Sequence, residues 1–70
     1  MLEQELGGII KARRAVLNIT QPHLAEMAGI SLNTLYKIET GQANPTIETV
    51  EKLLEVLGLQ ITIQPKKTVL

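Results

Sequence analysis

Residues 20–41 read TQPHLAEMAGISLNTLYKIETG, and this stretch decides the fold of the chain. Thr20 and Ser31 are residue types whose hydroxyl accepts a hydrogen bond from the unpaired backbone N–H groups at the start of a helix. Gly29 lies between them, and glycine often ends a helix because it adopts the left-handed conformation without strain. The stretch therefore predicts a short helix after Thr20, a tight turn at Gly29 and a second short helix after Ser31.

The second of these helices, expected over about residues 32–40, has two unlike faces. Leu35 and Ile38 recur at helical spacing and are expected to be buried. Four residues of the other face are expected to point outward: Leu32, Asn33, Tyr36 and Lys37. Tyr36 is the only aromatic residue of the chain. A large aromatic side chain that points outward is more typical of a binding surface than of an active site.

A longer helix is expected on each side of this stretch. The first covers about residues 3–17, is weakened by Gly7-Gly8 and ends at Asn18. Its apolar residues recur at helical spacing: Leu6, Ile9, Ile10, Val16 and Leu17. The later helix begins after Thr46, a capping residue, and ends at Gly58. Its apolar residues form a core stripe: Ile47, Val50, Leu53, Leu54 and Leu57.

The hydrophobic period changes from helical to alternating after Gly58. Leu59, Ile61 and Ile63 alternate with Gln60, Thr62 and Gln64, which predicts a strand over residues 59–64. A lone strand leaves its backbone N–H and C=O groups unpaired, so it needs a partner. The simplest partner is the same strand of a second copy, paired about a two-fold axis. The expected organisation is a helical domain over residues 1–58, a dimerisation strand over 59–64 and a short tail over 65–70.

Composition narrows the class of protein. Seventy residues allow one small domain, and the absence of Cys together with a single His argues against disulfides and a structural zinc site. No apolar run approaches the roughly 18–20 residues that span a bilayer, and no signal peptide is visible, so the cytoplasm is expected. No set of residues suggests a catalytic centre, a metal or a cofactor, and we do not expect an enzyme.

Charge counts mildly against nucleic acid as a ligand, because the net charge is zero and the pI is about 6.6. Its distribution softens that objection, since local potential matters more than the total. Cations lie in the predicted first three helices, at Lys11, Arg13, Arg14 and Lys37. Anions gather late in the chain, at Glu48, Glu51 and Glu55.

The chain from about residue 6 to residue 63 resembles the Xre/Cro/C1 family of helix-turn-helix regulators, which includes the lambdoid phage repressors. The residues that carry the resemblance are Arg13-Arg14, Thr20-Gln21, Leu24-Ala25, Gly29-Ile30-Ser31, Thr34-Leu35, Ile38-Glu39, Gly41, Asn44-Pro45-Thr46, Glu48-Thr49 and Leu57-Gly58. The resemblance implies a mainly α, lambda-repressor-like DNA-binding domain of four or five short helices, with the third helix in the DNA major groove. A strand directly after the last helix is similar to that of the HipB-like antitoxins, in which it pairs across the dimer. That narrower likeness implies a HipA-like kinase toxin as a partner.

The resemblance also implies roles for individual residues. Base contacts would come from Leu32, Asn33, Tyr36 and Lys37, and phosphate contacts from Gln21, Thr34 and Gln42. Arg14 and Glu39 would form a partly buried ion pair, a structural role. The dimer strand would be Leu59, Gln60, Ile61, Thr62 and Ile63. Each binding residue also has a plainer interpretation as a solvated or packing side chain on a helix surface.

Two positions depart from the family pattern. His23 stands where a Glu often completes the capping box that Thr20 begins, so the reciprocal bond to the cap is lost. Leu32 stands at a position that is often polar or basic, and it could contact a methyl group but read no hydrogen-bond pattern.

The expected function is a sequence-specific repressor that binds double-stranded DNA as a homodimer on a palindromic operator. It would act on the nucleoid in a bacterial-type cytoplasm, and the antitoxin of a toxin–antitoxin operon is one setting for it. The alternative is a protein-interaction module that keeps the helix-turn-helix fold without reading DNA. Neutral net charge and Leu32 favour that alternative.

Overall fold

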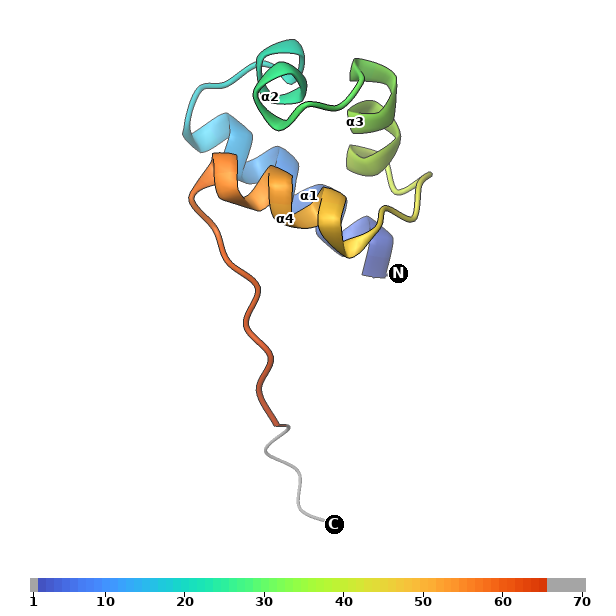
Figure 1. Cartoon of the computed structure of the whole chain (residues 1–70), viewed down its shortest axis with the longest axis vertical. Helices are drawn as coiled ribbons and strands as arrows, with labels where there is room; N and C mark the ends of the chain where they lie inside the picture. Colours follow the sequence, from blue (N-terminus) through green and yellow to red (C-terminus); the bar gives the residue numbers. More distant parts are fainter. Residues whose placement is uncertain (1, 66–70) are drawn as a thin grey trace.

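A computed structural model describes residues 2–65 of the chain, and these residues form four α-helices followed by an extended segment (Figure 1). The helices are α1 (Leu2–Val16), α2 (Gln21–Ala28), α3 (Leu32–Glu39) and α4 (Ile47–Leu57). The expectation of a mainly α fold with a helix-turn-helix is confirmed, and the helix bounds match those expected to within about one residue. None of the helices within residues 2–65 has the length and apolar composition needed to cross a membrane.

The starts of α2, α3 and α4 are fixed by hydroxyl caps. Thr20, Ser31 and Thr46 each accept a hydrogen bond from the backbone N–H three residues later, with N···O distances of 3.3, 3.0 and 3.2 Å respectively. Each bond satisfies a backbone donor that has no partner within the helix. These three contacts are those expected from the sequence, and they position the first turn of α2 and of α3.

A left-handed residue follows each of the four helices described, and Gly41 (φ 76°) is the one after α3. The others are Asn18 (φ 59°) after α1, Gly29 (φ 73°) after α2 and Gly58 (φ 71°) after α4. Gly29 donates its backbone N–H to the carbonyl of Glu26 at 3.2 Å, and Ile30 donates to the carbonyl of Ala25 at 3.0 Å. These bonds close the tight turn between α2 and α3, so only three residues separate the two helices.

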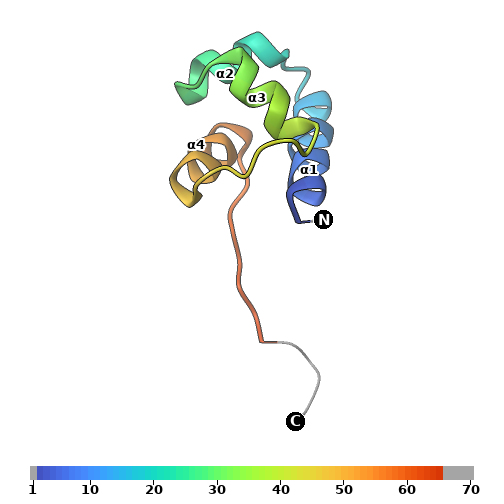
Figure 2. The same ribbon diagram turned by 90° about the vertical axis from the view of Figure 1, so that its right-hand side faces the viewer.

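The core lies where all four helices meet. In Figures 1 and 2, α1 and α4 form one layer and α2 and α3 lie across it, and α1 and α2 each pack against both α3 and α4. Six side chains have almost no exposed surface: Ile10, Leu24, Leu35, Ile38, Leu53 and Leu57. Burying such a side chain contributes about 1.5–3 kcal/mol relative to leaving it exposed. Two of the six belong to α3, so the orientation of this short helix is set by the core.

The expected core stripes are only partly buried. In α1, Ile10 is buried but Ile9, Val16 and Leu17 are exposed. Ile9 lies about 100° around the helix from Ile10, and the other two lie at or beyond the last turn of α1. In α4 the prediction was wrong for Ile47, which is 66% exposed while the rest of its stripe is buried. Ile47 opens α4, where an apolar groove remains uncovered.

The two adjacent glycines of α1 have different surroundings. Gly7 is buried, and a Cβ built on it would overlap the backbone carbonyl oxygen of Ile38 and lie 2.7 Å from that of Glu39. A Cβ on Gly8 would have no neighbour within 4 Å. The sequence predicts the same weakening of the helix at both positions, but Gly7 is also what lets α1 approach the end of α3.

The segment after α4 is extended and leaves the helical body, as the orange trace shows in Figure 1. No β-strand occurs within residues 2–65, so the strand expected over residues 59–64 is not formed in the single chain. A strand needs a neighbour for its backbone groups, and residues 2–65 of one copy offer none. Leu59 packs on the core, whereas Ile63 is 91% exposed. Residues 66–70 of the expected tail lie outside the described residues.

Candidate nucleic-acid interface

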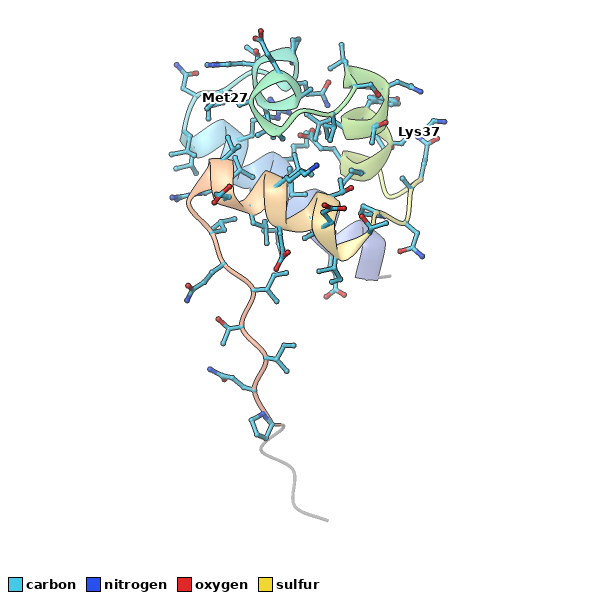
Figure 3. The ribbon with its side chains drawn as sticks, in the orientation of Figure 1. Met27 and Lys37 are labelled. Carbon is cyan, nitrogen blue, oxygen red and sulfur yellow. The ribbon has the colours of Figure 1, made fainter. Side chains whose placement is uncertain are left out.

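α3 turns one face to the core and the other to solvent. Leu35 and Ile38 are buried, as expected. Every residue assigned to the outward face is exposed: Leu32, Asn33, Tyr36 and Lys37. Lys37 projects from α3 away from the body of the molecule in Figure 3. The outward face is therefore available along the whole length of the helix.

This outward face divides into two stripes. Leu32 and Tyr36 are four residues apart and lie one above the other, and so do Asn33 and Lys37. The first stripe is largely apolar, with Leu32 46% and Tyr36 50% exposed. The second stripe carries an amide and an ammonium group. The helix thus offers an apolar contact next to hydrogen-bond donors.

A buried ion pair ties the end of α3 to α1. The Arg14 Nε donates to Glu39 Oε2 at 2.8 Å, and Arg14 Nη2 donates to Glu39 Oε1 at 3.0 Å. The remaining Arg14 Nη1 donates to the carbonyl of Ile19 at 3.0 Å. The Glu39 side chain is only 2% exposed and that of Arg14 is 16% exposed. Two parallel bonds between a guanidinium and a carboxylate are the strongest form of such a pair.

The pKa of Arg14 is raised above its ordinary value, first by the hydrogen bonds to Glu39 and then by the charge of that carboxylate, against the opposing effect of burial. A group whose pKa is raised on folding stabilises the fold at every pH below its unfolded pKa. This contribution is lost only as the pH rises through the raised value. Arg14 therefore keeps its charge throughout the range around neutral pH.

The same carboxylate also holds the start of α2. Gln21 Nε2 donates to Glu39 Oε1 at 2.9 Å, so one acidic side chain joins α1, α2 and α3. Gln21 is one of the three residues expected to contact phosphate. Its amide nitrogen has two N–H groups, and the second is not used in this bond. The sequence carries no signal for this contact, because Gln21 and Glu39 lie 18 positions apart on different helices.

Of the other two expected phosphate contacts, Thr34 lies in the first turn of α3 and Gln42 lies just beyond its last turn. Thr34 Oγ1 accepts a hydrogen bond from the Ser31 hydroxyl at 2.8 Å, beside the cap of α3. Gln42 Nε2 donates to Thr40 Oγ1 at 2.8 Å, just beyond the end of that helix. Both residues are exposed. The expected phosphate contacts are thus local polar groups at the two ends of α3 and not cations.

Arg13 has a role that sequence reasoning missed. Its Nε donates to the carbonyl of Leu57 at 2.9 Å, at the C-terminus of α4. A cation is favourable there because the last carbonyls of a helix lack partners and carry negative charge. Arg13 and Arg14 therefore both stabilise the fold. Of the cations expected near the site, Lys37 is the one that α3 itself presents.

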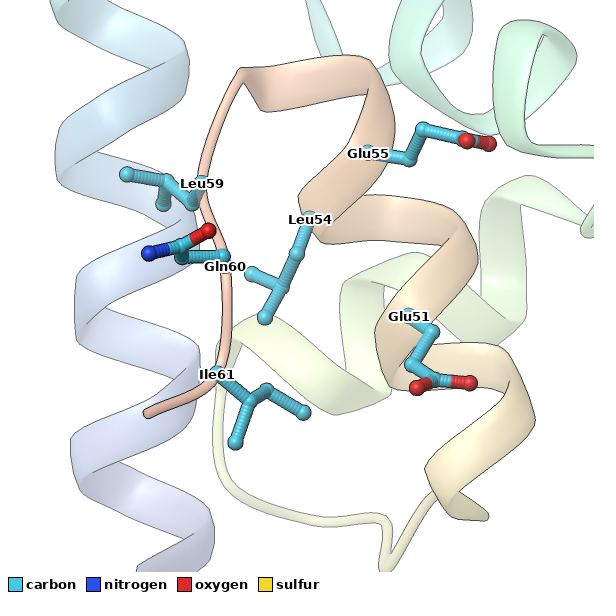
Figure 4. A pocket seen from close by; sticks show the side chains of 6 residues that line it. All are labelled: Glu51, Leu54, Glu55, Leu59, Gln60 and Ile61. Atoms are coloured by element: carbon cyan, nitrogen blue, oxygen red, sulfur yellow. The ribbon is translucent and has the colours of Figure 1, made fainter. Parts of the chain in front are cut away.

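An apolar groove opens where the C-terminal segment leaves α4. It has a volume of about 440 Å³ and is lined by Leu6, Asn44, Pro45, Ile47, Val50, Leu54 and Ile61. A second hollow of about 340 Å³ adjoins it and shares Leu54 and Ile61. In Figure 4 the side chains of Leu54 and Ile61 point toward each other, and Glu51 and Glu55 follow one side of α4.

The helix-turn-helix family HTH_3 matches residues 10–64, which is most of the chain and includes α2, the turn and α3. The chain belongs to this family of Xre/Cro/C1-type helix-turn-helix proteins.

Its relatives include regulators and a repressor. It is 42% identical over 62 residues to an uncharacterized protein of Haemophilus influenzae, covering 89% of this chain and 58% of that protein. It is 40% identical over 52 residues to an uncharacterized HTH-type transcriptional regulator of the same organism, covering 74% and 53%. It is 39% identical over 57 residues to the immunity repressor protein of Bacillus phage phi105, covering 81% and 40%. The chain thus spans no more than about three fifths of these relatives.

A solved structure shares the fold. The crystal structure of the clp gene regulator ClgR from Corynebacterium glutamicum superposes with a TM-score of 0.82 at 27% sequence identity. The match covers 84% of this chain and 63% of that chain.

Proposed function

We propose that this chain is a sequence-specific DNA-binding transcriptional regulator, a repressor that acts as a homodimer on a palindromic operator. The observation that carries the proposal is the outward face of α3. This face is exposed along the helix and carries hydrogen-bonding and apolar groups, and the core and the Arg14–Glu39 pair hold the helix in place. An α-helix of this kind fits the major groove of B-DNA and reads base edges there. The phage phi105 repressor and ClgR are relatives that support a regulatory role.

The proposal gives individual residues of the site a role. Asn33 would donate to and accept from adenine, and Lys37 would reach a guanine or a phosphate. Gln21 would use its free amide N–H on a phosphate at the start of α2, where the helix dipole also favours an anion. Thr34 and Gln42 would contact phosphates beside the two ends of α3. Such contacts place the helix in the groove, and the base contacts give specificity.

The charge of the site implies a regulator with modest non-specific affinity. Counterion release makes the salt dependence of binding proportional to the number of phosphates that Lys and Arg neutralise. Because Arg13 and Arg14 are engaged within the fold, Lys37 is the cation that α3 itself brings to DNA. Specific contacts, and not bulk charge, would then supply much of the affinity.

The C-terminal segment supports the dimer. Residues 59–64 alternate apolar and polar side chains, and Ile63 is exposed. Ile61 of this segment lines an open groove together with Val50 and Leu54. Antiparallel pairing with a second copy about a two-fold axis would satisfy the backbone and bring apolar side chains of both copies over α4. Two recognition helices would then lie about 34–36 Å apart, one turn of DNA.

A selection experiment tests the proposed function. The purified chain would be used to enrich duplexes from a random DNA pool at low and at physiological salt. The expected result is a palindrome whose half-sites lie about 10–10.5 base pairs apart, centre to centre. Enrichment of a single half-site would contradict the dimer, and enrichment of no sequence would contradict the proposed function.

The narrower proposal is an antitoxin that represses its own operon and binds a HipA-like kinase toxin. It rests on the C-terminal segment and its likeness to HipB-like antitoxins. A kinase-like toxin gene beside the gene for this chain, and a stable complex of the two proteins on co-expression, are the expected findings. An unrelated neighbouring gene would leave a free-standing regulator, acting on the nucleoid of the cytoplasm.

The second candidate function is a protein-interaction module with a helix-turn-helix fold. The apolar stripe of Leu32 and Tyr36 on α3 is the observation that favours it, because exposed apolar groups also suit a protein partner. Such a module would prefer no DNA duplex over another. Its affinity for its protein partner would not show the steep fall with salt that counterion release from DNA causes.

A further inference from the structure

We propose that Leu32 and Tyr36 recognise the C5-methyl group of thymine, so that each operator half-site carries a thymine at the position under this stripe. The proposal rests on the proposed function, because it names the bases that α3 would read. It concerns the apolar stripe of α3 and specifies one base of the DNA half-site.

The first support is that much of the apolar surface of the stripe stays uncovered by the fold. Leu32 and Tyr36 keep about half of their surface exposed, while Leu35 and Ile38 fill the core side of the same helix. Leu32 is the first residue of α3, immediately after the Ser31 cap. An apolar side chain thus stands at the N-terminal end of the helix, the end from which recognition helices of this motif contact base edges.

The second support is the chemistry of the major groove. Thymine presents an O4 acceptor and a methyl group, whereas guanine presents two acceptors and cytosine an amino group. Leu32 has no polar atom to pair with guanine or cytosine, and covering their polar edges without a hydrogen bond is unfavourable. Against the thymine methyl the same side chain makes an apolar contact. Leu32 therefore discriminates in favour of A·T pairs.

The third support is the position of the polar stripe. Asn33 and Lys37 lie next to Leu32 and Tyr36 around the helix, about 100° away. An asparagine amide pairs with the N6 and N7 of adenine. An amide and an apolar stripe side by side fit neighbouring adenine and thymine bases, which gives an A·T-containing half-site.

The test replaces single thymines by deoxyuridine in the duplex selected from the random pool. Deoxyuridine keeps the base pair and the O4 acceptor and lacks only the methyl group. Covering one methyl group corresponds to about a fourfold change in affinity, and to about fifteenfold when both half-sites are changed. We expect this loss at one thymine of each half-site with the wild-type chain. Replacing that A·T pair by G·C should weaken binding further, and 5-methylcytosine in place of the cytosine should recover part of the loss.

The matched variants are Leu32→Ala and Tyr36→Phe. Leu32→Ala should bind the thymine and uracil duplexes with nearly equal affinity while melting like the wild type, since Leu32 is half exposed. Tyr36→Phe should keep the preference for thymine, because it retains the ring and loses only the hydroxyl. Two results would overturn this inference and leave the proposed function intact. One is equal affinity of the wild-type chain for the thymine and uracil duplexes at every position. The other is a thymine preference that survives both Leu32→Ala and Tyr36→Ala. A pool that enriches no duplex would overturn the proposed function and this inference with it.

Discussion

Replacing Gly7 with alanine would place a methyl group against the backbone where α1 meets the end of α3. The new Cβ would overlap the carbonyl oxygen of Ile38 and lie 2.7 and 2.9 Å from the carbonyl oxygen and carbon of Glu39. Backbone atoms cannot turn away as a flexible side chain can, so the two helices must separate. The shift would fall directly on Glu39, which holds Arg14 and Gln21.

The neighbouring Gly8 provides a matched control for the magnitude. Alanine is about 1 kcal/mol more favourable than glycine inside a helix, and both substitutions receive this gain. Gly8→Ala meets no atom within 4 Å, so it should stabilise the chain by about 1 kcal/mol. Gly7→Ala adds a packing overlap that typically costs about 1–3 kcal/mol. The difference in unfolding free energy between the two variants therefore measures the packing overlap alone.

Thermal melting and urea denaturation of the two variants measure this difference. For a domain of this size, 1 kcal/mol corresponds to a shift in melting temperature of about 4–8 °C. Gly8→Ala should melt above the wild type, and Gly7→Ala should melt at least about 4 °C below Gly8→Ala. Equal stability of the two variants would refute the close approach of α1 to α3.

Three further predictions concern the ion pair, the base contacts and the dimer. Arg14→Ala should destabilise the chain by about 3–5 kcal/mol in urea denaturation, because it leaves the buried Glu39 carboxylate without its main partner, whereas Lys52→Ala on the exposed surface should change stability by less than about 0.5 kcal/mol. Equal melting of the two variants would show that the pair is fully solvated. Asn33→Ala should weaken binding to the selected duplex by about 1–3 kcal/mol and relax preference at one base pair; uniform weakening on all duplexes would exclude a base contact. Thr62→Pro should remove a donor from the proposed strand pair and shift sedimentation toward the monomer, while a wild-type chain that sediments as a monomer at high micromolar concentration would disprove the strand dimer.

Local signals along the chain were enough to predict the helices. The caps Thr20, Ser31 and Thr46 and the left-handed residues Asn18, Gly29 and Gly58 are fixed by chemistry within a few residues of each position. Each of these residues acts on the backbone of its own segment, through a cap hydrogen bond or a left-handed conformation. The predicted helix ends therefore agree closely with the observed ones.

Contacts between distant positions could not be predicted from local patterns. The bond from Arg13 to Leu57 spans 44 residues, and the bond from Gln21 to Glu39 spans 18. Gly7 and Gly8 are identical as residues, and only the approach of α3 distinguishes them. The exposure of Ile47 depends on a groove that forms between α1, α4 and the C-terminal segment. The strand of residues 59–64 depends on a second molecule and stays a prediction.

The most direct test of the central claim is the salt dependence of binding to the selected duplex, measured by fluorescence anisotropy beside a scrambled duplex. If the Lys37 of each protomer neutralises one phosphate, the slope of log affinity against log salt should be about −2 for the dimer. Lys37→Ala should flatten this slope, and Lys52→Ala on α4 should leave it unchanged. The chain should strongly prefer the selected duplex, and this preference should persist as the salt concentration rises. Equal affinity for the selected and scrambled duplexes at every salt concentration would contradict it.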